Sequence, residues 1–471
     1  MRVVARPTLG VAVLGYGHPM RVLLVQAFTA LDMELVYPLG LAYLASHIRD
    51  RHEVELFDVN LHRADPYAAL ESCVRAFAPD VVGFSLRNMK VGMPHLHTDD
   101  FEPQQKAIQL VKRVAPAAKI VAGGTAFSLY SEVMMRRLPE IDIGVWGEAE
   151  LRFRDLLDDI DHPEKLAGMY FRRGNDLVYT GQPGGVEWKD NLPPARDLVP
   201  HAPYMASSFV SVGVQAKRGC SLHCIHCSDT FLLGHRVRMR PPKEVVDEME
   251  LLVREHGVHQ MFMCDQIFNI PVAHAIAICE EITRRKLEVK WSAWFNEHRN
   301  TLPDNLMVAL KRAGCGLLSF SPDHVDDRML RNLDKNFRHE DMLYTVQVAK
   351  KHGMDVEYSF FLNSPGEDWR SLAAIVKFLA HARWELGGQL RLFTLLMMQP
   401  IRIYPHTRLH ELAKETGLVD PDHQLVEGQF WNPGTLQHAV AGIQAAAHSV
   451  YDLRAGWRKA RGNTFDSVVR G

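Results

Sequence analysis

Three cysteines stand close together near the middle of the chain. Cys220, Cys224 and Cys227 form a C-x3-C-x2-C pattern in the segment KRGCSLHCIHCS, which starts at Lys217. Thiolates ligate the iron of iron–sulfur clusters, and three of them in one loop can hold three irons while a fourth iron keeps an open position. Gly219 and the polar residues of the loop leave backbone amides free to face the cluster sulfides. The spacing therefore predicts a [4Fe–4S] cluster with one open iron.

Two other interpretations of these cysteines stay open in the sequence. A zinc ion could use His223, His226 or His235 as extra ligands, but zinc sites usually pair one C-x2-C knuckle with a second pair, which this chain lacks. The thiols could also be a chance group of buried side chains. The other cysteines are scattered and read as buried, inert thiols: Cys73, Cys264, Cys279 and Cys315. The odd total of seven cysteines argues against a disulfide framework.

Short apolar runs that alternate with amphipathic stretches predict an α/β protein, and they place the cysteines in its second domain. The first five strands are expected at 22–25, 54–57, 81–85, 120–122 and 143–145. The helices between them are expected at 39–51, 66–77, 104–114 and 129–138. This order is typical of a doubly wound, Rossmann-like domain, which we place at 1–185 with a hairpin near 165–180.

A proline-rich segment at 186–211 is expected to link this domain to the next, because its prolines disfavour a continuous helix. Six more strands are then expected at 212–216, 260–263, 289–293, 317–320, 356–361 and 392–397. Helices are expected among them at 242–255, 271–285, 304–313 and 339–351. Six such units predict a partial or full (β/α) barrel at 212–405, followed by a small helical C-terminal extension at 406–471 with a helix at 439–451.

The composition limits the classes of molecule that the chain is expected to bind. The chain of 471 residues has 54 basic and 56 acidic residues, so its formal charge of −2 creates no field that draws nucleic acid or an anionic membrane. No apolar run approaches the roughly 18 residues that span a bilayer, and residues 1–7 lack the apolar core of a secretion signal. We expect a cytoplasmic enzyme with a small-molecule substrate and without nucleic-acid or membrane partners.

The cysteine segment, directly after the first expected barrel strand, resembles the radical S-adenosylmethionine (SAM) superfamily. The resemblance implies that the open iron binds the amino and carboxylate groups of SAM. It further implies that an electron from the cluster splits the sulfonium to give a 5′-deoxyadenosyl radical, with a donor such as flavodoxin or ferredoxin. The position before the third cysteine is usually Tyr, Phe or Trp in that family, and here it is His226, which is also a flat ring.

Other barrel segments are similar to the SAM-contacting segments of the same family. They are MCDQ at 263–266, the fourth-strand region at 313–323, NSPGE at 363–367 and YPHT at 404–407. The SAM-binding residues that the resemblance implies are His226, Asp265, Gln266, Ser319, Asp323 and Asn363. Asp323 stands where a glutamate is common. A plain turn or core role is the alternative for each residue outside the cysteines.

Loops after the strands of the first domain point to a second cofactor, because doubly wound sheets bind ligands at that edge. No dinucleotide G-x-G-x-x-G or P-loop pattern is present. The loops resemble the cobalamin-binding domain of many radical SAM methyltransferases and a few cyclase relatives. The residues implied in cobalamin binding are Tyr37, Pro38, Leu39, Ser85, Leu86, Arg87, Asn88, Gly123, Gly124, Thr125, Gly147 and Glu148. The D-x-H-x-x-G motif is absent, so the lower face of cobalt is expected to lack a protein histidine; a degenerate domain without cofactor is the alternative.

The resemblance implies a cobalamin-dependent radical SAM methyltransferase that acts on an unactivated carbon, or phosphorus, of a small metabolite. A rearrangement, cyclisation or anaerobic oxidation, with cobalamin assisting or absent, is the second hypothesis. A non-catalytic iron–sulfur scaffold is the third. The sequence singles out no catalytic residue. Trp294, Asn296 and His298, at the end of the third expected barrel strand, are the candidate substrate contacts.

Overall fold

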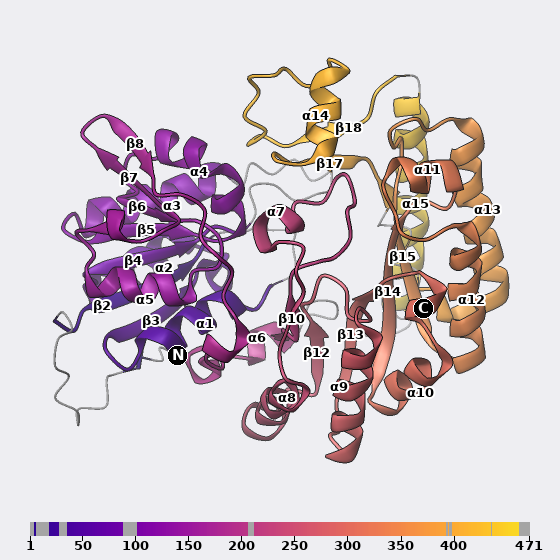
Figure 1. Cartoon of the computed structure of the whole chain (residues 1–471), viewed down its shortest axis with the longest axis horizontal. Coiled ribbons are helices and arrows are strands. Elements are labelled where there is room, and N and C mark those ends of the chain that lie inside the picture. Colours follow the sequence, from indigo (N-terminus) through magenta and orange to yellow (C-terminus); the bar gives the residue numbers. More distant parts are fainter. Residues whose placement is uncertain are drawn as a thin grey trace. The chain divides into compact units, whose positions relative to one another are not determined.

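The structure is a computed structural model that describes residues 4–5, 18–27, 35–87, 101–205, 212–391, 394, 398–434 and 436–460. The chain divides into two compact units. Unit 1 comprises Met1–Val91, His95–Tyr204 and Gln424–Gly428, and unit 2 comprises Gly92–Pro94, Met205–His423 and Gln429–Gly471. Figure 1 follows the elements of both units in chain order, from indigo to yellow.

Unit 1 is built on an eight-stranded sheet in the order β1-β3-β2-β4-β5-β6-β7-β8. The strands are β1 (Val4–Ala5), β2 (Arg21–Gln26), β3 (Glu53–Asp58), β4 (Val81–Ser85), β5 (Lys119–Gly123), β6 (Ile143–Val145), β7 (Met169–Arg173) and β8 (Asp176–Tyr179). The strands from β3 to β6 are parallel, and β7 and β8 form the expected hairpin. The strand order reverses between β2 and β4, so the ligand-binding switch point of a doubly wound sheet lies there. The predicted fold class is confirmed.

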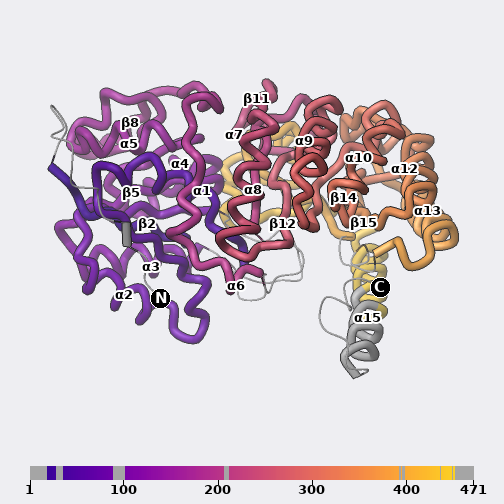
Figure 2. Tube along the Cα trace, turned by 90° about the horizontal axis from the view of Figure 1, so that it is seen from below, coloured from indigo at the N-terminus to yellow at the C-terminus, as the bar shows by residue number. Residues whose placement is uncertain are grey.

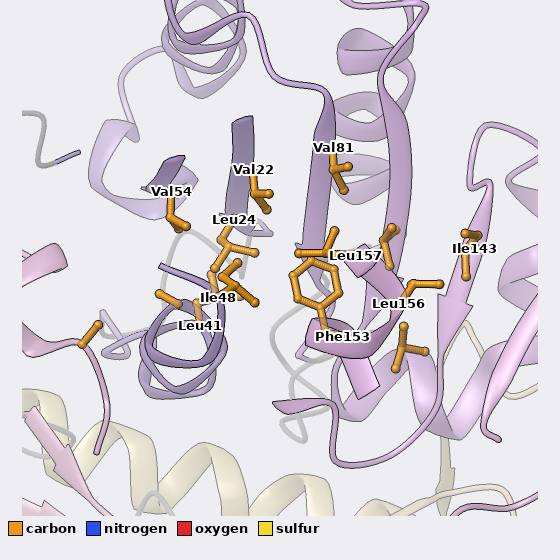
Figure 3. Packing of buried hydrophobic residues seen from close by; sticks show 14 of the residues in the cluster. Val22, Leu24, Leu41, Ile48, Val54, Val81, Ile143, Phe153, Leu156 and Leu157 are labelled. Carbon is orange, nitrogen blue, oxygen red and sulfur yellow. The ribbon is translucent and has the colours of Figure 1, made fainter. Parts of the chain in front are cut away.

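Both faces of this sheet are buried, which explains why its strands are almost continuously apolar. The helices are α1 (Leu39–Ile48), α2 (Pro66–Phe77), α3 (Phe101–Val114), α4 (Thr125–Arg137) and α5 (Glu150–Asp158). On one face, Val22 and Leu24 of β2 pack with Leu41 and Ile48 of α1 and with Phe153 of α5 (Figure 3). None of these five side chains is more than 2% exposed. Burial stabilises the fold by about 1.5–3 kcal/mol for each large apolar side chain.

Residues 188–204, in the segment expected to link the domains, belong to unit 1. They form the short helices η3 (Trp188–Asp190), η4 (Arg196–Leu198) and α6 (Ala202–Met205). The hydroxyl of Tyr204 donates a hydrogen bond of 2.5 Å to Oδ2 of the buried Asp58, at the end of β3. Gln26 Nε2 donates to the same oxygen at 2.9 Å. The segment is therefore fastened to the carboxyl edge of the sheet through buried polar groups.

A second, later segment also belongs to unit 1. Arg137, at the end of α4, donates hydrogen bonds from Nη2 to Gln424 Oε1 at 2.6 Å and from Nη1 to Glu427 Oε1 at 2.9 Å. These partners come from Gln424–Gly428, which follows most of unit 2 in the sequence. Unit 1 is thus assembled from stretches that are far apart in the chain.

Unit 2 contains a six-stranded parallel sheet in the order β16-β15-β14-β13-β12-β9. The strands are β9 (Val212–Val214), β12 (Gln260–Met263), β13 (Lys290–Phe295), β14 (Cys315–Asp323), β15 (Asp355–Phe361) and β16 (Met398–Gln399). Among the described residues, the end strands β9 and β16 are not paired, so the sheet is a partial barrel. The sixth strand expected at 392–397 lies outside the described residues except for Thr394.

Helices cover one face of this sheet. They are α8 (Pro242–His256), α9 (Val272–Arg284), α10 (Asp304–Arg312), α11 (Asp327–Asn332), α12 (His339–His352) and α13 (Trp369–Leu386), and most of them follow one another along the sheet in Figure 2. Aromatic rings of the strands meet α13 on this side: the ring of Tyr358 lies 5.6 Å from that of Phe320 and 5.1 Å from that of Phe378. The side chains between these residues along the strands therefore face the opposite way.

The remaining elements follow the sheet. They are β17 (Ile401–Ile403), α14 (Arg408–Glu415), β18 (Gln429–Trp431) and the tail helix α15 (Leu436–Ala460), which contains the helix expected at 439–451. No helix in the described part of the chain is both long enough and apolar enough to span a bilayer.

Candidate functional site

The three cysteines lie in a loop framed by a small hairpin that the sequence did not predict. Strands β10 (Lys217–Arg218) and β11 (Arg238–Met239) pair antiparallel on either side of it, and α7 (Asp229–Leu233) lies within it. Gly219 has φ +90°, and a Cβ there would lie 2.3 Å from the carbonyl oxygen of Arg236. Only glycine permits this close approach of the two sides of the loop. All three thiols are free, and each is partly exposed.

The histidines of this loop contact other side chains. His223 stacks on His235 at 4.6 Å between ring centroids. His226 meets the edge of Phe361 at 4.9 Å, and its Nε2 lies 3.4 Å from Asp323 Oδ2. No three His, Cys, Asp or Glu side chains within the described ranges are arranged to hold one metal ion. A cluster spreads its thiolates over different irons, so the cysteine loop fits a cluster better than a single zinc.

A buried charged group lies beside the cysteines. Lys335 Nζ is 2.5 Å from Asp323 Oδ2 and donates a hydrogen bond of 2.9 Å to the carbonyl oxygen of Ser321. Burial acts to lower the pKa of Lys335, but the negative charges of Asp323, Cys224 and Glu297 outweigh it, and its pKa is raised. Lys335 is therefore a permanent cation next to a predicted cluster ligand.

Glu297, just after β13, belongs to the same charged group. Its side chain is buried, and burial raises its pKa to about 8, with a smaller opposing effect from Lys335. Burial also raises the pKa of the Cys224 thiol, and Lys335 opposes that shift. Neither Glu297 nor Lys335 was among the residues predicted to bind SAM. Long-range folding brings them together: Glu297 follows the third expected barrel strand, and Lys335 follows the fourth-strand region.

Asp265 fastens the start of the cysteine loop to the end of β12. Its Oδ1 accepts hydrogen bonds from the backbone N–H groups of Ala216 at 2.8 Å and Lys217 at 3.0 Å. Its Oδ2 is buried and makes no hydrogen bond with the described residues. The same holds for three further atoms near the cysteine loop and the strand ends: Gln266 Oε1, His226 Nδ1 and Glu297 Oε1. Buried polar atoms are normally paired, so this set fits a polar ligand that bears N–H groups.

Ser319 and Asn363 have partners within the chain. Ser319 is fully buried, and its hydroxyl donates a hydrogen bond of 2.6 Å to Glu357 Oε1. Asn363 has φ +60°, and its Nδ2 donates to Asn432 Oδ1 at 2.6 Å and to the carbonyl oxygen of Pro433 at 2.8 Å. The structure thus joins His226 and Asp323 directly, whereas Asn363 holds the turn after β15 to the C-terminal segment.

Two of the three candidate substrate contacts have local structural roles. Asn296 is 1% exposed, and its Nδ2 donates to Asn336 Oδ1 at 2.9 Å. His298 Nδ1 accepts a hydrogen bond of 3.1 Å from the backbone N–H of Asn300 and so caps the short helix η5 (Arg299–Thr301). Trp294 is half-buried and lies on the sheet face that the helices leave open.

In unit 1, the structure brings three of the predicted cobalamin loops together. Leu86, after β4, donates from its N–H to the carbonyl oxygen of Gly123 at 2.8 Å. Gly124 follows β5 with φ +96° and leads directly into α4. Ser128 of α4, which the sequence did not single out, accepts a hydrogen bond of 2.8 Å from the N–H of Gly147 after β6 and donates to Gly124 O at 2.9 Å. These hydrogen bonds connect the loops after β4, β5 and β6 into one loop edge beside the switch point.

The other predicted cobalamin residues occupy varied positions. The Tyr37 ring is buried against His201, whose Nε2 lies 3.3 Å from the Tyr37 hydroxyl, so it anchors the segment that includes α6. Glu148 Oε2 accepts a hydrogen bond of 2.7 Å from the N–H of Val186. Pro38 occupies the N-cap position of α1, Leu39 begins α1, Ser85 ends β4, Arg87 is half-buried after β4 and Thr125 begins α4. Asn88 lies outside the described residues.

Replacing Gly124 with alanine is expected to lower the free energy of unfolding by about 1–3 kcal/mol. The reason is twofold: φ is +96°, and the added Cβ would lie 2.7 Å from the carbonyl oxygen of Leu86. The displaced edge should also lower the amount of cobalamin bound per chain. Urea unfolding and cobalt analysis measure the two effects. Gly40→Ala in α1 is the control, since its Cβ meets no atom within 4 Å; equal behaviour of both variants would contradict the prediction.

Comparison with known proteins finds two family models in this chain. The B12 binding domain matches residues 33–157, and the Radical SAM superfamily matches residues 214–379. An uncharacterised methyltransferase of Pyrococcus horikoshii is 28% identical over 386 residues, which are 81% of this chain and 79% of the relative. The anaerobic magnesium-protoporphyrin IX monomethyl ester cyclase of Rubrivivax gelatinosus is 23% identical over 352 residues, or 72% of this chain and 61% of the relative.

Two solved structures share the fold. The radical SAM methyltransferase TsrM of Kitasatospora setae, with tryptophan and a SAM analogue bound, matches with a TM-score of 0.70 and 20% identity, covering 84% of this chain and 76% of TsrM. The cobalamin-dependent SAM radical enzyme OxsB, with aqua-cobalamin and SAM bound, matches with a TM-score of 0.72 and 14% identity, covering 93% of this chain and 68% of OxsB. At these identities the matches establish similarity of fold.

Proposed function

This chain is a radical SAM enzyme that carries a cobalamin-binding domain, and we propose that it methylates an unactivated carbon, or phosphorus, of a small metabolite. One observation carries the proposal: the same chain combines a three-cysteine loop after a partial-barrel strand with a glycine-rich loop edge at the switch point of a B12-type sheet. Radical chemistry alone does not require the second domain. Methyl transfer to an unreactive atom needs both a radical source and a methyl carrier.

The cysteine loop is suited to the first cofactor. Cys220, Cys224 and Cys227 would hold a [4Fe–4S] cluster, which supplies an electron and an open iron for the cleavage of SAM. The cation of Lys335 offsets the negative charge of thiolate ligands and attracts a carboxylate, since unlike charges interact strongly at low dielectric. Three oxygens near the strand ends that make no hydrogen bond with the described residues would accept hydrogen bonds from an ammonium group: Asp265 Oδ2, Gln266 Oε1 and Glu297 Oε1. The chain therefore offers complementary groups for both charged ends of an amino acid such as SAM.

The loop edge of unit 1 is suited to the second cofactor. Cobalamin, when bound, supplies a carrier for the methyl group. We infer that cobalamin packs against the backbone of Leu86, Gly124 and Gly147, because the two glycines have positive φ values and present no side chain there. The fixed hydrogen bonds among the three loops keep this surface rigid before a ligand arrives.

The remaining partners follow from the chemistry. A one-electron donor such as flavodoxin or ferredoxin would reduce the cluster. All seven cysteines are free thiols, which supports a reducing cytoplasmic location. The similarity to a cyclase supports a second candidate, a radical cyclisation or oxidation without net methyl transfer.

Product analysis tests these proposals. The protein is prepared without oxygen and loaded with iron, sulfide and cobalamin. It is then reduced with titanium citrate and given SAM whose methyl group carries three deuterium atoms. A small-molecule extract of the source cells supplies the substrate. We expect 5′-deoxyadenosine, S-adenosylhomocysteine and a metabolite that carries the deuterated methyl group. Formation of 5′-deoxyadenosine without S-adenosylhomocysteine would favour the cyclisation or oxidation. Absence of both 5′-deoxyadenosine and S-adenosylhomocysteine would overturn the proposed function.

A further inference from the structure

The open face of the unit 2 sheet carries a buried carboxyl group that the chemistry above does not use. Glu357 lies in the middle of β15 and is 3% exposed. Its neighbour Tyr358 and the next alternate residue, Phe360, both pack on Phe378 of α13, with ring centroids 5.1 and 6.0 Å apart. Since successive side chains of a strand point to opposite faces, Glu357 faces away from α13.

A row of three side chains crosses this face. Trp294 on β13 is in register with Ser319 on β14, and Ser319 is in register with Glu357 on β15. Paired residues of neighbouring parallel strands share a face, and strands lie about 4.8 Å apart, so the backbones of Trp294 and Glu357 are about 10 Å apart. The middle of the row is the small residue Ser319, whose hydroxyl reaches the carboxyl group of Glu357.

Only one of the two carboxyl oxygens of Glu357 accepts a hydrogen bond from the described residues. Ser319 donates to its Oε1 at 2.6 Å, and Oε2 has no hydrogen-bond partner among the residues that the structure describes. Arg391, the cation whose charge acts on Glu357, forms an ion pair with Asp355. Burial raises the pKa of Glu357 to about 7, against smaller opposite effects of Ser319 and Arg391. Burying a carboxyl group with one hydrogen bond is unfavourable, and an apolar residue would serve packing better.

The position of Glu357 along the strand sets the orientation of a ligand. Phe361 lies four residues further along β15 on the same face, and its ring contacts His226 of the cysteine loop at 4.9 Å. At about 3.3 Å per residue, the two positions are about 13 Å apart along the strand. A molecule that bound here with one end at Glu357 would extend along β15 toward the cysteine loop.

We propose that Glu357 is the substrate anchor and that it binds a protonated amine through Oε2, while Ser319 holds Oε1 and Trp294 flanks the bound molecule. This inference rests on the proposed function and adds the substrate class: a small organic cation whose reacting atom lies at the end remote from its amine. An ionised carboxylate only accepts hydrogen bonds, and it repels anions. The indole of Trp294 adds an attractive surface for a cation. A substrate carboxylate in the same place would be unfavourable.

Binding of matched probes to the loaded full chain tests the inference. The probes are n-butylamine, phenethylamine and tryptamine, each paired with the carboxylate of the same skeleton: valerate, 3-phenylpropionate and indole-3-propionate. Calorimetry is performed without oxygen and with SAM present. We expect at least one amine to bind the native chain tenfold or more tightly than its carboxylate, about the effect of one charge-assisted hydrogen bond. Glu357→Gln should abolish this preference.

Controls separate the possible failures. Glu280→Gln changes an exposed glutamate of α9 and should leave the preference intact. Iron content per chain reports whether Glu357→Gln folds; if it does not, Ser319→Ala decides, and we expect that variant to weaken the preference severalfold. No amine preference in the native chain, or a preference that survives the deciding variant, would overturn the inference. Formation of 5′-deoxyadenosine in the same samples tests the proposed function separately, so the two failures can be told apart.

Discussion

A chain with Cys224 replaced by alanine is expected to lose the reductive cleavage of SAM, with a fall of about a thousandfold or more in the rate of 5′-deoxyadenosine formation. The three thiols come from one loop, and that loop is held in shape by Gly219 and the β10–β11 pair. Removing one thiol would leave a second iron without a protein ligand. The iron expected to bind SAM would then no longer be the single iron with an open position. Iron and sulfide analysis of protein prepared without oxygen should show partial or no cluster.

Cys279→Ala is the matched control for this experiment. Cys279 is a buried cysteine of α9 and does not belong to the cysteine loop. Its replacement should keep the cluster and SAM cleavage, and lower the free energy of unfolding by about 1 kcal/mol through lost packing. Full iron content and unchanged cleavage in Cys224→Ala would show that another residue supplies the third ligand.

Replacing Lys335 with methionine is expected to lower the free energy of unfolding of the apo chain by about 3–5 kcal/mol, because a buried charge loses its partner. Lys335 is the cation of a buried group with the carboxyls of Asp323 and Glu297. The affinity for SAM should fall as well, since the cation that faces Cys224 is gone. Urea unfolding of unit 2, followed by the fluorescence of its tryptophans, and equilibrium binding of SAM to the loaded chain measure the two effects.

Two further variants isolate the cause of this loss. Lys350→Met removes an exposed lysine whose Nζ is 2.8 Å from Glu385 Oε2, and surface pairs contribute at most about 1 kcal/mol. Adding Asp323→Asn to Lys335→Met removes one of the unpaired charges and should restore part of the stability. If the double variant is no more stable than Lys335→Met, the loss comes from packing of the lysine side chain and the electrostatic explanation is wrong.

The strands and most helices of this fold could be predicted because their apolar periods are strong. The start of α4 could not be predicted: the pattern placed it at residue 129, and the structure begins the helix at Thr125. The pair Gly123–Gly124 reads as a loop, and only the positive φ of Gly124 turns the chain directly into a helix. The helix start is therefore part of the predicted cobalamin edge, where the sequence suggested a separate loop.

Some residues of the candidate site could be predicted from the sequence, and others could not. The cysteine loop is a local motif, and it was visible in the sequence. Glu297 and Lys335 join Asp323 only through the packing of strand ends, so no spacing rule finds them. Asn296 and His298 were chosen for their polar side chains at a strand end, but short polar side chains in such places commonly bind nearby backbone and turns. Glu357 lies inside a strand with no motif around it, and its role depends on which face it occupies.

The segment Gln424–Gly428 has a consequence for how the protein is made. Arg137 of α4 leaves the ribosome long before its partners Gln424 and Glu427 do. Unit 1 therefore stays incomplete until most of unit 2 has been synthesised, so its folding cannot be completed before unit 2 is largely made. A gene fragment that stops at Tyr204 would encode a first unit that lacks its last piece, so exchanging the units between relatives requires moving this segment too.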